Sequence, residues 1–364
     1  MPLIFFLAVI TIGYLIQEWS KKNALNGVEF QYKPSRLLVA PEEQFQITTT
    51  ITNRSLRFIP FVRLKEILPE TITIHVPGVV VSTDRINRHA WYTSMIYLMP
   101  RKSLVREIPV SIPNRGWYTF SGAELQGGDF LGTGENYKKV DSFNEIVIYP
   151  KVAENAYIDR VVGGFLGDIS VRRFIIEDPI LTAGFREYTG REPMKAISWS
   201  QSLRAGRMMV KSYDYTTEIS AGVVLNVDRN ATGDTKYDIQ LIEHCLSIAH
   251  TVCRALEQKR IKYDFFSNIV TFGSHGSWDY ISEGLGASHF QTILEGLGRA
   301  SGTSSELFHT LVNRVFSKQM DDKAIIFIVP GSAEEAKIII DGRDEGRAVI
   351  ISAETSVNKV VNYE

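Results

Sequence analysis

The stretch at residues 219–227 reads ISAGVVLNV and is followed directly by Asp228. A nearly continuous apolar run is typical of a strand buried on both faces, as in a parallel sheet. Downstream, apolar residues recur at helical spacing, and these helical segments alternate with further apolar runs. Strand, helix, strand, helix, strand is the rhythm of a parallel doubly wound sheet. The predicted strands are 219–227, 262–272, 324–329 and 348–352, and the predicted helices are 238–259, 288–298 and 305–316.

A basic and aromatic segment, residues 184–215, lies just before this strand. It contains six Arg or Lys residues, five aromatic residues and three glycines. Ligands of open α/β sheets collect at the carboxyl ends of the strands. A loop of this composition that leads into such a sheet therefore predicts a binding surface at the sheet edge.

Most of this segment resembles the hallmark of the family described as "domain of unknown function 58". The family pattern combines R-E-Y-x-x-G-D, I-x-W-x-x-S-A-R-x-G and V-K, and the chain keeps this order, with one residue instead of two between Tyr188 and Gly190. The chain departs from it at 190–192, which reads Gly-Arg-Glu in place of Gly-Asp, and at Leu203, where the family has a small residue. The family has no established reaction, so the resemblance implies no catalytic residues. The matching residues are Arg186, Glu187, Tyr188, Gly190, Ile197, Ser198, Trp199, Ser202, Arg204, Gly206, Val210 and Lys211.

Three interpretations of the segment are open. In the first, Arg186, Glu187 and Arg204 form a paired network, with Trp199 as a buried anchor. In the second, the loop is a docking surface for a partner protein. In the third it binds nucleic acid, which is disfavoured because acidic residues dilute the patch and the whole chain has a net charge of −1. The predicted partner-binding or structural residues are Arg186, Glu187, Tyr188, Trp199, Ser202, Arg204 and Lys211.

The end of the 219–227 run resembles the start of a metal-ion-dependent adhesion site of the von Willebrand factor type A fold. That site begins D-x-S-x-S, and the matching residues are Asp228, Asn230 and Thr232. Mg²⁺ prefers hard oxygen ligands, but the later strand is followed by Pro-Gly-Ser at 330–332, without a carboxylate. The predicted Mg²⁺ site is therefore degenerate. The alternative is that Asp228 caps the following turn while the other two residues bond to backbone.

Residues 28–150 show a different pattern of apolar and polar residues. Apolar and polar residues alternate in stretches such as 44–51 and 106–112, and Pro, Gly and Asn punctuate them at short intervals. This alternation predicts a small antiparallel β-sandwich with one wet face.

The amino terminus is apolar. Residues 2–17, PLIFFLAVITIGYLIQ, carry no charge, and Lys21 and Lys22 follow. Counted to Trp19, the span is close to the minimum of about 17–25 residues for a membrane helix. A signal peptide would need a charged start and a small-x-small cleavage site, and neither is present. The lysines favour a cytoplasmic location for the following domains.

These patterns predict a multidomain, single-pass protein of the cell membrane whose soluble domains face the cytoplasm. The predicted segments are a transmembrane anchor at 1–20, an all-β sandwich at 28–150, a connecting arm with the hallmark loop at 151–218, and an α/β doubly wound von Willebrand factor A-like domain at 219–364.

The predicted function is that of a membrane-anchored, non-catalytic adaptor in protein–protein interaction. The motifs H-E-x-x-H, G-x-S-x-G, G-x-G-x-x-G and the Walker loop do not occur, and 273–277 and 283–286 are predicted as loops. The family resemblance implies a MoxR-type AAA+ ATPase as the partner. Two alternatives use the degenerate site at Asp228: a metal-dependent hydrolase, and an extracellular adhesion module with the opposite topology.

Overall fold

A computed structural model provides the structure of the protein. The chain divides into two compact units. The first comprises Met1–Lys151, Phe272–Ser274 and Leu294–Ala300, and the second comprises the rest. The four predicted segments remain a prediction, since this division does not test them. The residues that the structure describes are 11–15, 18, 25–77, 81–84, 89–128, 135–154, 156–172, 182–213, 220–228, 235–273, 278–318, 323–340 and 348–355.

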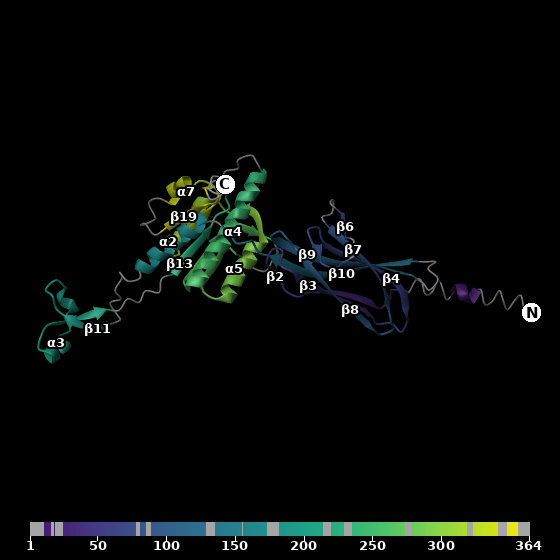
Figure 1. The fold of residues 1–364 in the computed structure, drawn as a ribbon, viewed down its shortest axis with the longest axis horizontal. Coiled ribbons are helices and arrows are strands. Elements are labelled where there is room, and N and C mark those ends of the chain that lie inside the picture. The colour runs from purple at the N-terminus through teal and green to yellow at the C-terminus, as the bar shows by residue number, and fades with distance from the viewer. Residues whose placement is uncertain are drawn as a thin grey trace, which may run out of the picture. The chain divides into compact units, whose positions relative to one another are not determined.

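The first unit contains two sheets that face each other around one core (Figure 1). Neighbouring strands are antiparallel except for the short parallel pair of β2 and β10. The four-stranded sheet has the order β1 (Val28–Pro34), β3 (Phe45–Asn53), β8 (Ser103–Ser111) and β5 (Thr73–Ile74). The six-stranded sheet has the order β2 (Leu38–Val39), β10 (Glu135–Ile148), β9 (Gly116–Gly128), β4 (Ile59–Pro69), β7 (His89–Leu98) and β6 (Val81–Asp84).

The alternation in the sequence builds this core. In β3, every second residue from Phe45 to Asn53 is buried, and the residues between them are exposed or half-buried. Successive side chains of a strand point to opposite faces, so one face of β3 lies against the other sheet. That sheet supplies Leu64, Leu125 and Ile146, which are fully buried. Each such side chain stabilises the fold by about 1.5–3 kcal/mol relative to exposure.

One charged cluster lies within this apolar core. The Glu66 side chain is 1% exposed and accepts a hydrogen bond from Thr49 Oγ1 at 2.7 Å and another from the Arg106 guanidinium. Arg106 also donates to Ser94 Oγ at 2.8 Å and lies over the Tyr92 ring at 4.8 Å. Burial raises the pKa of Glu66, because it penalises the charged form more than Arg106 and the hydrogen bonds favour it.

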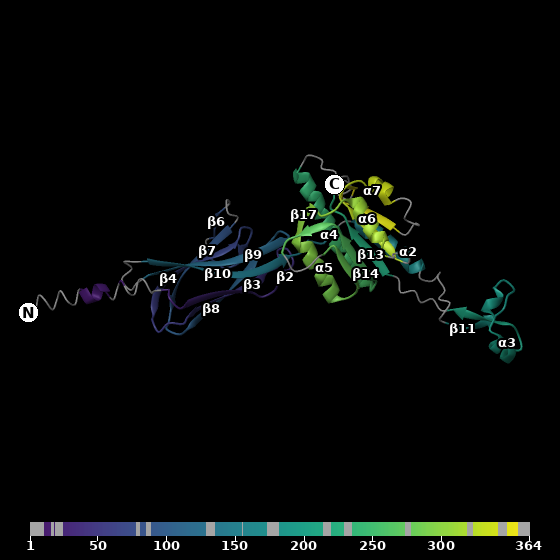
Figure 2. The same ribbon diagram turned by 180° about the vertical axis from the view of Figure 1, so that it is seen from behind.

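The second unit contains a five-stranded sheet (Figure 2). Every residue of its central strand is buried, as the apolar run predicted. The sheet order is β16 (Tyr280–Gly284), β14 (Lys262–Ser267), β13 (Ser220–Leu225), β18 (Ala324–Val329) and β19 (Ala348–Ser352). Helices described after Lys151 include α2 (Ala156–Arg172), α4 (Thr235–Lys259), α5 (Ala287–Arg299), α6 (Phe308–Phe316) and α7 (Ala333–Ile340).

The predicted fold class is wrong as a whole. The chain is mostly β, and its strands lie in several separate sheets. The five-stranded sheet is mixed, because β16 is antiparallel to β14. A second departure occurs at Asn268, where the predicted strand 262–272 is divided into β14 and β15 (Ile269–Thr271), and β15 pairs with β17 (Ala300–Ser304) in another sheet. No parallel doubly wound von Willebrand factor A-like domain is therefore assigned.

The physical reason lies in the sequence of β16. Its residues, YISEG, are exposed or half-buried and form no apolar run. An edge strand needs little apolar surface, since only one of its sides meets another strand. Because β16 has no apolar run, its last residues, within 283–286, are predicted as a loop.

The predicted single-pass membrane location is also corrected. Of the predicted anchor at 1–20, the structure describes only 11–15 and Glu18. No helix within the described ranges is long and apolar enough to cross a bilayer. The prediction rested on the apolar composition of residues 2–17, and composition alone does not establish the helix of about 20 residues that a span needs.

Candidate functional site

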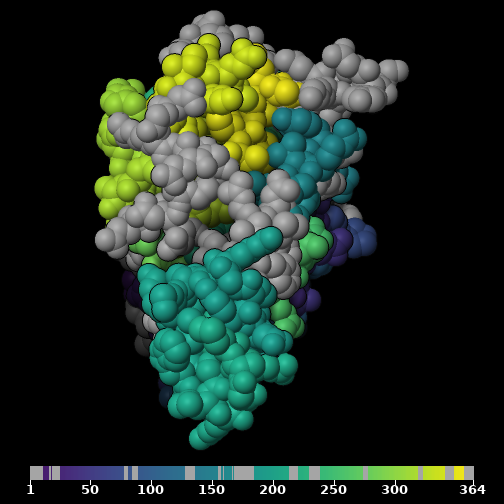
Figure 3. Space-filling model, turned by 90° about the vertical axis from the view of Figure 1, so that its left-hand side faces the viewer, coloured from purple at the N-terminus to yellow at the C-terminus, as the bar shows by residue number. Residues whose placement is uncertain are grey.

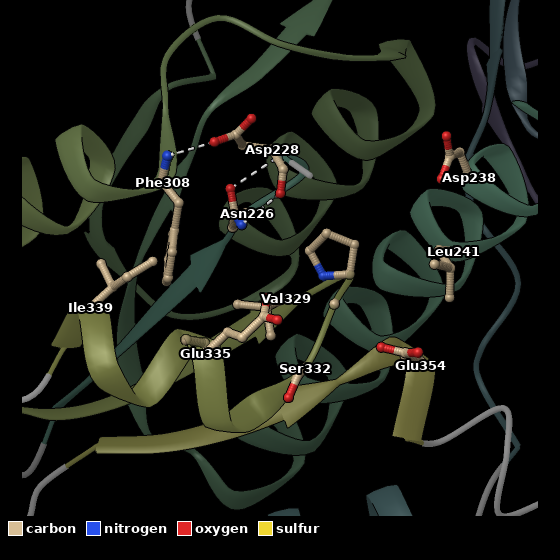
Figure 4. A pocket seen from close by; sticks show the side chains of 13 residues that line it. Asn226, Asp228, Asp238, Leu241, Phe308, Val329, Ser332, Glu335, Ile339 and Glu354 are labelled. Atoms are coloured by element: carbon tan, nitrogen blue, oxygen red, sulfur yellow. Dashed lines mark hydrogen bonds between the residues drawn. The ribbon is translucent and has the colours of Figure 1, made fainter. Parts of the chain in front are cut away.

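A cavity of about 320 Å³ lies at the carboxyl ends of β13 and β18 (Figure 4). Two parallel neighbouring strands end at the same sheet edge, so the residues that follow them gather there. Asn226 and Asp228 follow β13, and Ser332 follows β18. The lining residues are Asn226, Asp228, Asp238, Leu241, Phe308, Val329, Pro330, Gly331, Ser332, Glu335, Ala336, Ile339 and Glu354.

Two buried asparagines, Asn226 and Asn268, form hydrogen bonds at this edge of the sheet. Asn268 Nδ2 donates to Asn226 Oδ1 at 2.7 Å and to the Glu306 carbonyl at 3.0 Å, and the Val227 N–H donates to Asn268 Oδ1 at 2.9 Å. Asn226 Nδ2 in turn donates to the Asp228 carbonyl at 3.0 Å. These bonds satisfy backbone groups where the strands end. Sequence reasoning missed both residues, although a polar residue that ends a buried strand is a usable signal.

Asp228, the predicted metal ligand, binds a helix end. The Phe308 N–H, at the start of α6, donates to Asp228 Oδ2 at 2.9 Å, as Figure 4 shows with a dashed line. A carboxylate at a helix amino terminus satisfies a free N–H and the helix dipole. Asp228 therefore caps a helix 80 residues away. The following turn, which the predicted capping role concerned, lies outside the described residues.

Of the three predicted Mg²⁺ ligands, the structure describes only Asp228. Asn230 and Thr232 lie outside the described residues. Within the described ranges, no group of three or more His, Cys, Asp or Glu residues could hold a metal ion. One oxygen of the Asp228 carboxylate already accepts a hydrogen bond from the first residue of α6. The Mg²⁺ site remains a prediction, and no metal chemistry is derived from this edge.

The hallmark residues form a small element of their own, which we call the hairpin and define as residues 182–213. Strands β11 (Thr182–Glu187) and β12 (Met209–Tyr213) pair only with each other among the described strands. The 3₁₀ helix η1 (Met194–Ala196) and helix α3 (Trp199–Ala205) lie between them. The hairpin is the teal surface of Figure 3.

Ser202 connects α3 to β12. Its hydroxyl donates to the Ser198 carbonyl at 2.8 Å and accepts a hydrogen bond from the Met209 N–H at 2.8 Å. The Ser198 N–H donates to the Met209 carbonyl at 2.8 Å. Gly206, in the left-handed region at φ 67°, ends the helix and allows the chain to return to β12. Ser202 is therefore a structural residue of the hairpin.

The ion pairs of the hairpin differ from the predicted network of Arg186, Glu187 and Arg204. Arg186 pairs with Glu192, and Glu187 pairs with Arg207 at 3.4 Å. Glu192 also accepts from Thr189 Oγ1 at 2.8 Å. The Arg186 hydrogen bond, with the Thr189 bond second, lowers the pKa of Glu192 to about 2.

Trp199, predicted as a buried anchor in one interpretation, is 61% exposed. Leu203, four residues later on α3, is 86% exposed. Tyr188 is half-buried, and its N–H donates to the Met208 carbonyl at 2.9 Å. The two remaining predicted residues of the hairpin, Arg204 and Lys211, are exposed.

Comparisons with known proteins do not identify the chain. No family model matches it, and no curated protein matches it. The resemblance to the "domain of unknown function 58" family therefore remains a prediction.

Three of the matching solved structures show how distant the structural likenesses are. The CARDB domain of the PF1109 protein from Pyrococcus furiosus is 11% identical, with a TM-score of 0.22 over 33% of this chain and 91% of that chain. Alpha-2-macroglobulin from Escherichia coli is 16% identical, with a TM-score of 0.24 over 35% and 17%. A cohesin of ScaC from Acetivibrio cellulolyticus is 12% identical, with a TM-score of 0.23 over 33% and 99%. At these TM-scores, the likenesses carry no argument about this chain.

Proposed function

We propose that the protein is a non-catalytic binding adaptor that docks a partner protein through the hairpin. The observation that carries the proposal is the pair of large apolar side chains, Trp199 and Leu203, that α3 presents to solvent. Residues four apart lie on the same face of a helix. Tryptophan side chains of this kind are frequent energetic centres of protein interfaces.

Further apolar side chains of the hairpin are exposed. Phe185 is 42% exposed, Met194 69% and Met208 41%. Soluble proteins seldom leave a large contiguous apolar surface in water without a use for it. Aromatic residues, Met and Arg are also the residue types enriched at protein interfaces. The composition of the hairpin thus favours protein docking.

The charges indicate the chemistry of the partner. The hairpin contains six Arg or Lys residues and two glutamates, and both glutamates are already paired with arginines. No carboxylate pairs with the other four cations within the described residues. A partner that surrounds an apolar patch with Asp or Glu would complement this surface. The four cations are Arg191, Lys195, Arg204 and Lys211.

The hairpin contains few of the side chains that most often act in nucleophilic catalysis. It contains no His, Cys or Asp, and the Ser202 hydroxyl is bonded to backbone on both sides. A nucleophilic serine requires an adjacent general base. This composition supports binding rather than nucleophilic catalysis at the hairpin itself.

The test uses the partner that the family resemblance implies, a MoxR-type AAA+ ATPase from the same organism. Binding to the full chain is measured by titration calorimetry for the wild type and for the double variant Trp199→Glu, Leu203→Glu. Each side chain, as an interface centre, contributes about 2 kcal/mol or more, so the double variant should bind about 1,000-fold more weakly. Binding should also weaken as salt increases.

The control is Phe143→Glu, because Phe143 is 77% exposed on β10. It should bind like the wild type. Equal binding by all three proteins would contradict docking through the hairpin. Failure of the wild type to bind would remove the ATPase as the partner.

A further inference from the structure

On one side of the sandwich, the described strands leave parts of two strand edges unpaired. In the six-stranded sheet, β6 pairs with β7 only opposite residues 89–92. In the four-stranded sheet, β5 pairs with β8 only at Val110 and Ser111. Among the described residues, no strand therefore lies beside 93–98 of β7 or 103–108 of β8 on that side.

A groove of about 310 Å³ lies along these edges, at the turn that joins β7 to β8. It is lined by residues 95–99 and 102–104 and is defined here as the β7–β8 groove. Leu98 is buried in the sandwich core, and Ile96 is half-buried against it. Leu104, at the start of β8, is 38% exposed. The groove therefore gives access to the apolar interior between the two sheets.

The rim of the groove is also apolar. Met95 is 65% exposed, Tyr97 62% and Met99 50%. An open strand edge presents unpaired N–H and C=O groups, and proteins usually protect such an edge with charges, proline or a bulge. Here the edge of β7 has Met and Tyr in these positions. This combination is suited to an added strand, in which backbone bonds give affinity and side-chain pockets give specificity.

We propose that the β7–β8 groove binds an extended, apolar segment of a partner protein, which adds to β7 as a further strand. This surface is separate from the hairpin, and the inference does not rest on the proposed function. The open stretch of β7 would accommodate about six residues, or roughly 20 Å of strand. Every second side chain of the segment would enter the groove toward Ile96 and Leu104.

The charges at the turn indicate the chemistry of one end of that segment. Arg101 and Lys102 are exposed, and no carboxylate of the described residues pairs with either side chain. A segment flanked by Asp or Glu would meet these cations as it leaves the groove. The occupant is thus a β-forming segment with apolar residues at alternate positions and an acidic residue at the end that lies near this turn.

The probe is a fluorescent peptide, Glu-Val-Thr-Val-Thr-Val-Glu, titrated into the full chain and followed by anisotropy. We expect saturable binding with a Kd between about 1 µM and 1 mM. Hydrogen exchange should slow at residues 93–98 when the peptide binds. The same peptide with proline at its centre should not bind, because proline cannot donate to a strand ladder.

Variants at two adjacent residues of β8 test whether peptide binding depends on the groove or on the strand in general. Leu104→Lys places a charge in the groove and should weaken binding at least tenfold. Val105→Lys is the control, since Val105 is 58% exposed and does not line the groove. Circular dichroism and exchange at β3 and β9 establish that both variants are folded.

Three results would overturn the proposal. The first is no binding of the peptide up to about 1 mM. The second is binding without protection of 93–98, or with equal loss in both variants. The third is dimerisation of the wild type in sedimentation that Leu104→Lys abolishes, because the groove would then be occupied by a second copy of this chain.

Discussion

Glu66 in the sandwich and Glu192 in the hairpin have nearly the same partners, yet their pKa values move in opposite directions. Each accepts hydrogen bonds from one arginine and one threonine. Burial raises the pKa of Glu66, whereas the hydrogen bond from Arg186 lowers that of Glu192 to about 2. The partners alone therefore do not set the direction of the shift.

The difference arises from the surroundings of each carboxylate, and in particular from how much water remains near it. The Glu66 side chain is 1% exposed within a sandwich core, so removal of water opposes its charge. The Glu192 side chain is 14% exposed, but the groups that cover it belong to a hairpin of 32 residues with water close behind them. Apolar side chains follow the same rule. The sandwich buries them, while the hairpin fully buries only a few, such as Val210, and exposes Trp199.

Replacing Arg106 or Arg186 by Ala should give the largest difference in effect on stability. Arg106→Ala leaves the Glu66 charge buried without its partner, and breaking a buried pair costs about 3–5 kcal/mol. We expect the free energy of opening of β3 and β4 to fall by about 3 kcal/mol at pH 7, measured by native-state hydrogen exchange. Arg186→Ala is the matched change in the hairpin, at a pair whose arginine is 51% exposed, and should leave β3 and β4 unchanged. Equal effects of the two variants on β3 and β4 would contradict the role assigned to burial.

The pH dependence should have opposite signs in the two regions. The raised pKa of Glu66 means that the folded state holds the proton more tightly, so its contribution is full below the ordinary value of 4.5 and is lost as pH rises through the raised value. The lowered pKa of Glu192 gives a contribution present above 4.5 and lost as pH falls through about 2.

Hydrogen-exchange rates of backbone amides in the sandwich and in the hairpin, measured between pH 2 and 8, test whether the stabilities of the two regions depend on pH with opposite signs. Glu66→Gln should remove the decline of the sandwich at rising pH, and Glu192→Gln should remove the decline of the hairpin in acid. Slopes of the same sign in both regions would show that the pairing, and not the surroundings, controls these carboxyl groups.

Ser202 tests how the hairpin holds together without a core. Ser202→Ala leaves the Met209 N–H without its acceptor, which costs about 1–2 kcal/mol for a partly buried group. The exchange of the Met209 amide should accelerate by roughly tenfold, while the sandwich stays unchanged. Ser200→Ala is the control, because Ser200 is exposed and its hydroxyl lies 3.5 Å from that of Ser198. A larger effect from the control would exclude the Ser202 contact as the stabilising one.

The smallest effect is expected for Glu187→Gln. Glu187 and Arg207 are both 61% exposed and lie 3.4 Å apart, and exposed pairs of this kind contribute less than about 1 kcal/mol. The exchange of β11 should change by less than about fivefold at moderate salt. A larger change would indicate that the hairpin depends on its surface charges more than on the Ser202 contact.

Local patterns in the sequence predicted several elements correctly. The alternation in β3 identified a strand with one buried face, and the apolar run of β13 identified a strand buried throughout. Both patterns depend on the few neighbours of each residue along the chain, and a window of the sequence contains those neighbours. The order of strands within each sheet depends on distant pairing, and the predicted fold class was wrong at that level.

The candidate site could be predicted only in part for the same reason. Asp228 stood out because it ends a buried strand, but its partner at Phe308 is 80 residues away. Arg186 and Glu187 are neighbours in the sequence, yet Arg186 pairs with Glu192, because successive side chains of a strand point to opposite faces. The sequence by itself determined which residues are apolar, charged or able to cap a helix. Tertiary structure alone decided which partner each one meets and how much water remains beside it, since both depend on segments that are distant along the chain.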